Sequence, residues 1–258
     1  MAREWDAREY EELSAPQTRW GAEVVGRLDA RGDEAAIDAG CGTGRVTELL
    51  LGKLPRGSVL AIDNSRAMVE AARRRFANEP RVRVERQDLL RLEVTGPVDL
   101  IFSTATFHWI KDHDRLFERL APALKPHGRL VAQCGGEGNI SRATRATKGT
   151  MAEERFRDYF VGWEDDKNYA DPETTAKRLE AAGFEEVETW LHDETAAFDS
   201  VDELARFMAT VVLGGHLERL PEGERGPFAA AVAERIVDVD GSPALDYVRL
   251  NMRARRSV

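Results

Sequence analysis

Three glycines at alternate positions follow an acidic residue early in the chain. Gly40, Gly42 and Gly44 come after Asp38 and a short apolar run, and a helical pattern of apolar residues begins immediately behind them. Glycine permits positive φ angles and lets a ligand approach the main chain, while the first N–H groups of a helix have no partners within it. We therefore interpret residues 36–44 as a strand and a tight loop that binds a polar ligand at a helix start. An ordinary strand-to-helix turn is the alternative.

The spacing of these glycines disfavours two other nucleotide-binding loops. A dinucleotide-binding loop of the G-x-G-x-x-G type would need a third glycine at position 45, where the chain has Arg45. No Gly-Lys-Ser/Thr follows, as a phosphate-binding P-loop would require. Cys41, inside the loop, is interpreted as a small packing residue rather than a nucleophile, and with Cys134 it forms neither a metal-binding pattern nor a disulfide framework. We predict no metal site.

Two further carboxylates follow predicted strands. Residues 58–63 form a short apolar run, and Asp63 ends it about 20 residues past the glycine loop, a spacing at which an acidic side chain can accept hydrogen bonds from ribose hydroxyls. Residues 82–86 alternate between apolar and polar and lead to Asp88. Ligands of open α/β sheets bind outside the carboxyl ends of the strands, so both carboxylates are candidates for one site. The alternatives are a helix cap for Asp63 and an ordinary loop carboxylate for Asp88.

The order of the predicted elements defines the fold class. Strands alternate with helices in the first half of the chain, which predicts a parallel sheet with right-handed crossovers. From Gly135 onward the chain is charged, helical in period and dotted with aromatic residues, and two more strands close it. The other strands are expected at 98–103, 129–133, 184–191 and 246–254, and helices at 65–76, 112–124, 172–182, 201–213 and 228–237.

Length and composition suit one domain. The chain has 258 residues, of which 42% are hydrophobic and 32% charged, enough for a single soluble globular domain with an elaborated lid. The formal net charge of -9 disfavours a nucleic acid as partner, since such binding rests on many Lys and Arg contacts to phosphates. No apolar run reaches membrane-spanning length or resembles a signal peptide. We therefore expect a cytoplasmic protein with no membrane partner.

Four features resemble, in order and spacing, the class I S-adenosylmethionine-dependent methyltransferases: the glycine loop behind Asp38, the carboxylates Asp63 and Asp88, and the strand end at Ser103. The resemblance implies a Rossmann-like α/β fold, with a mostly parallel seven-stranded sheet, helices on both faces and a helical lid. It implies S-adenosyl-L-methionine as cofactor and S-adenosyl-L-homocysteine as product. The glycine loop would support the amino-acid half of the cofactor, and Asp88 would meet the adenine amine. The residues nominated for the cofactor are Asp38, Gly40, Cys41, Gly42, Gly44, Asp63, Asn64, Met68, Asp88, Leu89 and Ser103.

On this basis the single domain divides into four segments. We expect N-terminal lid helices in residues 1–30 and a cofactor-binding core in 31–138. A helical substrate-cap insertion follows in 139–178, too short to have a core of its own. Residues 179–258 supply the C-terminal strands and helices.

One stretch narrows the resemblance further. Residues 103–113, which contain the His108-Trp109 pair, resemble the trans-aconitate methyltransferases and the insect juvenile hormone acid methyltransferases, which methylate a carboxylate. That group also has a tyrosine followed seven residues later by a polar residue, as Tyr10 and Gln17 stand here. In the juvenile hormone acid enzymes a glutamine holds the carboxylate together with the tryptophan, which nominates Gln17 and Trp109 as catalytic. The acceptor would be an at least partly hydrophobic carboxylic acid. Aromatic candidates for its pocket are Tyr10, Phe107, Phe160 and Trp163.

Other chemistries remain open. A carboxylate is already ionised at neutral pH, so its methylation needs alignment and exclusion of water rather than a strong base. If the acceptor were an N, O or C centre of a secondary metabolite, His108 or His113 could remove its proton, although His108 could equally be a packing residue. A non-catalytic module that binds S-adenosylmethionine is a further alternative. Methylation of nucleic-acid amino groups is disfavoured, because no Asn/Asp-Pro-Pro-Tyr/Phe follows the fourth strand.

Overall fold

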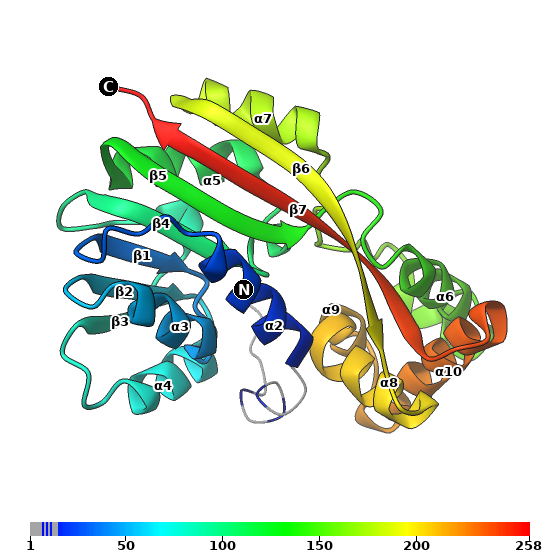
Figure 1. Ribbon diagram of the computed structural model, residues 1–258. Helices are drawn as coiled ribbons and strands as arrows, with labels where there is room; N and C mark the ends of the chain where they lie inside the picture. Colours follow the sequence, from blue (N-terminus) through cyan, green and yellow to red (C-terminus); the bar gives the residue numbers. More distant parts are fainter. Residues whose placement is uncertain (1–6, 8, 10, 12–14) are drawn as a thin grey trace.

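The computed structural model describes residues 7, 9, 11 and 15–258, and a seven-stranded sheet runs through this part of the chain (Figure 1). Its strands are β1 (Ala35–Ala39), β2 (Ser58–Asp63), β3 (Val82–Arg86), β4 (Val98–Thr104), β5 (Leu124–Gly135), β6 (Phe184–Ala197) and β7 (Ala244–Arg256). They lie in the order β3-β2-β1-β4-β5-β7-β6. β1 to β5 are parallel to one another, whereas β7 is antiparallel to both β5 and β6. This confirms the predicted mostly parallel, Rossmann-like sheet.

Helices cover both faces of this sheet. They are α2 (Ala15–Gly26), α3 (Arg45–Lys53), α4 (Arg66–Arg75), α5 (His113–Leu120) and α7 (Pro172–Ala181). Because side chains alternate along a strand, neighbouring positions of β2 serve different faces. Val59 packs in a cluster with Leu50 of α3, and Ile62 packs in a cluster with Phe117 of α5. The strand is apolar on both sides, as its continuous apolar run predicts.

A second core lies outside the sheet, in a group of helices that we call the cap. It contains α6 (Ser141–Met151), α8 (Val201–Phe207), the π-helix η5 (Met208–Val212), α9 (Gly214–Leu217) and α10 (Glu222–Asp240), gathered at the far end of β6 and β7 (Figure 1). Phe156, Phe207 and Phe228 are buried among them. The sequence analysis placed the cap in residues 139–178 alone, a segment too short for its own core. In the structure residues 198–243 complete that core, while α7 packs on β6 instead.

The helix α2 joins the two cores. Val24 and Val25 pack beside Leu50 on the sheet, whereas Trp20 is buried in the cap core with its ring centroid 4.6 Å from that of Tyr247. The side of α2 that carries Trp20 therefore reaches the cap. Of the lid helices expected in residues 1–30, α2 is described over its full length, and Tyr10 lies outside the described residues.

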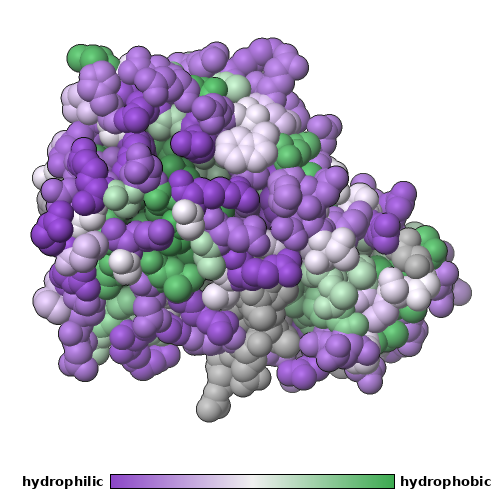
Figure 2. Space-filling model, in the orientation of Figure 1, coloured by the Kyte–Doolittle hydropathy of each residue, from purple (hydrophilic) through white to green (hydrophobic). Residues whose placement is uncertain are grey.

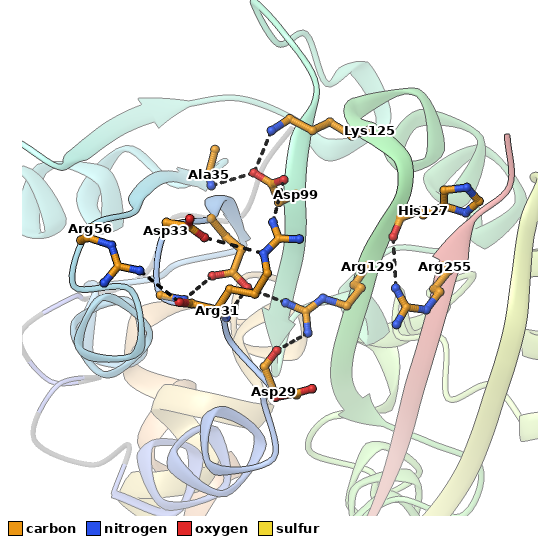
Figure 3. Close-up of polar contacts among 12 residues, drawn as sticks. Asp29, Arg31, Asp33, Ala35, Arg56, Asp99, Lys125, His127, Arg129 and Arg255 are labelled. Atoms are coloured by element: carbon orange, nitrogen blue, oxygen red, sulfur yellow. Dashed lines mark hydrogen bonds and ion pairs between the residues drawn. The ribbon is translucent and has the colours of Figure 1, made fainter.

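Charged side chains cross-link the amino edge of the sheet, where β1 and β4 begin (Figure 3). Asp99 of β4 accepts a hydrogen bond from the Ala35 N–H at 3.0 Å and pairs with Lys125 at 2.9 Å. Beside it, Glu34 is fully buried and pairs with Arg129 at 2.7 Å. Both carboxylates at this edge thus meet a backbone donor or a cation that holds the ends of the strands in place.

Hydrophilic residues predominate on the face of the molecule shown in Figure 2, and hydrophobic residues are visible on the sheet-bearing part and on the cap. Among the described helices, none combines the length and the apolar character needed to span a bilayer. The large hydrophobic side chains are instead collected in the two cores.

Candidate functional site

A large cavity of about 770 Å³ lies at the carboxyl ends of β1, β2 and β4. Its walls come from α2, the glycine loop, the turn after β2, residues 86–91, and the loop after β4. Carboxyl strand ends are the ligand-binding edge of an open α/β sheet, and this volume lies within the usual range for small-molecule sites. The predicted cofactor residues that line the large cavity are Gly40, Cys41, Gly42, Asp63, Asn64, Met68, Asp88 and Leu89.

The glycine loop is held in a backbone conformation that side chains would disturb. Gly40, Gly42 and Gly44 have φ angles of 87°, 54° and 88°. A Cβ atom at Gly40 would also lie 2.1 Å from Oγ1 of Thr106, a contact that no side chain can make. Both the angle and the close approach therefore require glycine at position 40.

Asp63 fastens this loop to the next helix. Its Oδ2 accepts a hydrogen bond from the Gly42 N–H at 3.0 Å, and its Oδ1 accepts one from the Ser65 N–H at 2.9 Å. Ser65 is the residue that caps α4, accepting a hydrogen bond from the Met68 N–H. Asp88 plays a similar local part, since its Oδ1 accepts the Leu90 N–H at 2.9 Å. Each carboxylate is thus oriented by the backbone and lines the large cavity.

Three of the predicted cofactor residues lie behind the cavity wall rather than in it. Asp38 is buried, and the Thr47 hydroxyl donates to its Oδ2 at 2.6 Å. Burial raises the pKa of Asp38 to about 7; the hydrogen bond from Thr47 opposes this and the charge of Asp63 adds to it. The buried Ser103 hydroxyl donates to the Ala39 carbonyl at 2.6 Å, joining β4 to β1, and Gly44 precedes α3. These residues support the loop from below.

A second, much smaller cavity adjoins the large one, and we call it the inner pocket. Its volume is about 40 Å³. Gln17, Ala105 and Trp109 line both cavities and so form the boundary between them. Ala105 has a φ of 54°, a strained value for a residue with a side chain, of the kind found at functional sites. The inner pocket is lined by Gln17, Ala105, His108, Trp109, Asn139, Ile140, Lys167, Tyr169, Val211, Val212, Tyr247 and Arg249.

The inner pocket is electropositive. Arg249 is 2% exposed, donates to Oε1 of Gln133 at 3.4 Å and holds its guanidinium 4.7 Å from the ring centroid of Trp20. The Lys167 side chain is 6% exposed and pairs at 3.0 Å with Asp165, which lies outside this pocket. The residues that line the inner pocket include no Asp or Glu. Two cations in so small a space favour an anionic ligand.

His108 lines this pocket and accepts a hydrogen bond through one of its ring nitrogens. The Gly135 N–H donates to its Nδ1 at 3.3 Å, so the neutral ring carries its proton on Nε2. Burial, together with the positive charges of Arg249 and Lys167, holds the pKa of His108 well below its usual range. A neutral ring whose second nitrogen already bears the proton is poorly suited to act as a base. His113 is also buried, and its Nε2 bonds to the Phe107 carbonyl at 3.0 Å.

Gln17 presents its amide at the boundary between the two cavities. Its Oε1 is buried and has no hydrogen-bond partner among the described residues. A buried acceptor without a partner is costly, which indicates that a hydrogen-bond donor meets this oxygen when the site is occupied, while the amide NH2 group stays available to donate. Trp109, the other residue nominated as catalytic, lines both cavities from the loop after β4, with the Lys167 ammonium 5.4 Å from its ring centroid.

The aromatic candidates for the acceptor pocket are dispersed. Phe107 is fully buried in the sheet core, where its ring packs edge-on against Phe117. Phe160 lies in the cap core, and Trp163 lines a third cavity inside the cap. Large aromatic side chains fill cores as readily as they line pockets, so residue type alone did not separate the two uses.

Cys41 lines the large cavity, and burial raises its thiol pKa well above the usual value, which disfavours a nucleophilic role.

Sequence reasoning did not identify Arg249 or Lys167. A signal exists for Arg249, because Tyr247, Arg249 and Asn251 alternate along one side of β7 and are all buried. Polar residues in that pattern normally mark an exposed face. They become notable only once β7 is known to lie between β5 and β6, which no local pattern reveals. Lys167 belongs to an irregular segment without periodicity.

Comparisons with known proteins identify the family. A family model described as a methyltransferase domain matches residues 36–128. The trans-aconitate 2-methyltransferase of Methylobacterium nodulans is 30% identical over 98% of this chain and 99% of its own length. That of Rhizobium meliloti is 30% identical over 98% and 99%.

Solved structures share the fold at low identity. Phosphoethanolamine N-methyltransferase 2 of Haemonchus contortus, in complex with phosphomonomethylethanolamine and S-adenosylhomocysteine, superposes with a TM-score of 0.62 at 17% identity, over 98% of this chain and 57% of that chain. The YcgJ protein of Bacillus subtilis superposes with a TM-score of 0.64 at 12% identity, over 93% and 99%. At such identities the likeness concerns the fold alone.

Proposed function

The chain belongs to the S-adenosylmethionine-dependent methyltransferases, and we propose that it transfers the methyl group to a carboxylate oxygen of a small organic acid, forming a methyl ester. The observation that carries the proposal is the inner pocket. It has two buried cations, no carboxylate among its lining residues, and a shared boundary with the large cavity at Gln17, Ala105 and Trp109. An anion held there would face whatever the large cavity binds.

The large cavity suits the cofactor. Its residues offer carboxylates at Asp63 and Asp88, which we assign to the ribose hydroxyls and the adenine amine, and apolar contacts from Met68 and Leu89 for the base. The glycine loop, which lines the cavity at Gly40, Cys41 and Gly42, is assigned to the amino-acid half. When bound, the cofactor supplies an electrophilic methyl group on a sulfonium centre.

The acceptor would be aligned rather than deprotonated. A carboxylate is ionised at neutral pH, so the residues around it need only orient one oxygen toward the methyl group, about 3 to 3.5 Å away. The Gln17 amide and the Trp109 indole N–H can donate hydrogen bonds to that carboxylate without neutralising it. Arg249 would balance its charge, and the buried walls exclude water. Methylation of another centre with a histidine base is less compatible with the proton on Nε2 of His108.

Trans-aconitate is the first acceptor to test, because the full-length relatives carry it in their names. The purified protein would be incubated with S-adenosylmethionine bearing a labelled methyl group and with trans-aconitate or other carboxylic acids. Mass spectrometry would then identify labelled methyl ester and S-adenosylhomocysteine. A protein that binds the cofactor but esterifies no acid would overturn the carboxylate proposal.

Trp109→Phe tests the alignment. The substitution keeps a ring beside Lys167 and removes the N–H, so we expect kcat/KM for the acid to fall about tenfold, the loss of one hydrogen bond of roughly 1.4 kcal/mol. Trp190→Phe is the matched control, since this residue lies on β6 and lines none of the three cavities. Equal rates in both variants would contradict the assigned role of Trp109.

A further inference from the structure

A third cavity, the cap cavity, continues the inner pocket into the cap. Its volume is about 310 Å³, and it lies between α6, residues 163–169 and the turn from η5 to α9. Ile140, Lys167, Tyr169 and Val212 line both this cavity and the inner pocket. The exposed residues Lys148 and Glu164 also line it. The cap cavity thus adjoins the inner pocket and has surface residues of the cap in its wall.

The inner pocket alone is too small for most acids. By the same measure of volume a single water needs about 10 to 15 Å³, so a cavity of about 40 Å³ has room for about three waters, the size of a carboxylate group and its first carbon. The large cavity on the opposite side is taken up by the cofactor during the reaction. With the cofactor assigned to the large cavity, the cap cavity is the adjoining space that offers room for the rest of the acceptor.

The walls of the cap cavity indicate what that remainder is. Ala143 and Met151 of α6, Trp163 and Leu213 give it apolar wall area. Its polar lining residues are Thr144, Thr147, Lys148, Glu164, Asp165, Lys167 and His216. Lys167 lines both the cap cavity and the inner pocket, and its buried ammonium pairs with the exposed Asp165 of the cap cavity, so the lysine can face the carboxylate end of a ligand at the junction. Apolar side chains beside the buried Lys167 ammonium fit an elongated acid that enters with its carboxylate inward.

We propose that the cap cavity is the distal half of the acceptor site and holds the apolar body of an elongated carboxylic acid, with Lys167 as the residue that positions the carboxylate. This inference rests on the proposed function, because it takes the acceptor to be an acid. It also assigns a ligand-binding role to α6, a helix that carries none of the motifs on which the resemblance to methyltransferases rests. It also predicts that a compact polycarboxylate is not the preferred acceptor.

Chain-length dependence tests the inference through binding. Butanoate, octanoate, dodecanoate and trans-aconitate would be titrated by calorimetry into the protein complexed with S-adenosylhomocysteine. We expect octanoate to bind at least tenfold more tightly than butanoate, since several methylene groups leave water. Equal affinity for butanoate and octanoate would overturn the proposal, as would binding of trans-aconitate alone.

Two substitutions on α6 locate the effect. Thr144→Phe fills the cap cavity and should remove the advantage of octanoate over butanoate while leaving S-adenosylhomocysteine binding unchanged. Arg145→Phe, on the exposed side of the same helix, should leave both unchanged. Met151→Ala enlarges the cavity and should shift the preference toward dodecanoate. If Thr144→Phe weakens both acids equally, or Met151→Ala causes no shift, the cap cavity is not the subsite.

The same samples separate this inference from the proposed function. Acids that bind with the expected length dependence but yield no methyl ester would refute carboxylate methylation and keep the binding site. Ester formed from acids of every length at equal efficiency would support the methylation and refute the distal subsite.

Discussion

The two edges of the sheet carry aspartates whose pKa values are shifted in opposite directions. At the amino edge, the charges of Lys125 and Arg31 and the backbone N–H of Ala35 outweigh the effect of burial, and the pKa of Asp99 lies below its usual value. At the carboxyl edge, Asp38 accepts a hydrogen bond from the Thr47 hydroxyl, but burial outweighs this bond and raises the pKa of Asp38 to about 7. Asp99 at the amino edge therefore ionises more readily than an ordinary aspartate, and Asp38 at the carboxyl edge ionises less readily.

The difference separates stability from function. Charges that the protein itself neutralises hold strands together, as Arg129 does for Glu34. The carboxyl edge instead gathers Asp38, a His108 of lowered pKa and a buried Arg249 around two cavities. Perturbed groups of this kind concentrate where a ligand is needed to complete the electrostatics.

The largest expected difference between the two edges is the pH dependence of the contribution that Asp38 makes to the free energy of unfolding. The folded carboxyl has a pKa of about 7 against an ordinary 3.8, so the folded protein keeps a proton that the unfolded chain has lost between these values. The cofactor-free protein should lose up to about 4 kcal/mol of stability from this group as pH rises from about 4 to 7. Asp38→Asn should abolish that loss, as measured by urea unfolding at several pH values.

Asp99→Asn is the counterpart at the other edge. The pKa of Asp99 is lowered, so its stabilisation is present above the ordinary pKa and disappears as pH falls through the folded value. The difference between wild type and variant should therefore shrink toward acid pH for Asp99 and grow toward neutral pH for Asp38. Parallel curves for the two variants would mean that the edges do not differ.

Removal of Glu34 should give the next largest effect. Glu34→Ala leaves Arg129 and the N–H groups of Arg31 and Gly32 without their carboxylate, and we expect the free energy of unfolding to fall by about 3 kcal/mol. Activity per folded molecule should stay unchanged, because the site lies at the far edge. Asp33→Ala is the control, since this side chain is 57% exposed and should cost less than about 0.5 kcal/mol. A large loss of cofactor affinity in Glu34→Ala would break the comparison.

The smallest expected effect concerns His108. Its pKa is already well below the usual range, so kcat with saturating cofactor should vary less than about twofold between pH 6 and 9. A rate that rises with a midpoint in that interval, and loses the midpoint in His108→Gln, would identify a histidine base and a different acceptor chemistry.

The fold and the cofactor class were predictable because their signals are local. The glycine loop, Asp63 and Asp88 each follow their own strand within a few residues, and the parallel order then brings them to one edge. The assignment of single residues to parts of the cofactor stays a prediction. The cap could not be predicted, because its core joins residues 139–160 to residues 198–243, which share no local pattern. Arg249 escaped notice for the same reason, since its burial depends on strand order.

The long strands β6 and β7 have a mechanical consequence. They pair continuously from the sheet, where Phe184 meets Arg256, to the cap, where Ala197 meets Ala244, apart from a bulge near Glu185. Two strands that are hydrogen-bonded to each other over this length form a stiff connection rather than a hinge. We therefore expect the cap to keep its distance from the sheet throughout a catalytic cycle. Ligands would then enter by movements of side chains and of α2, not by a rigid-body closure of the cap onto the sheet.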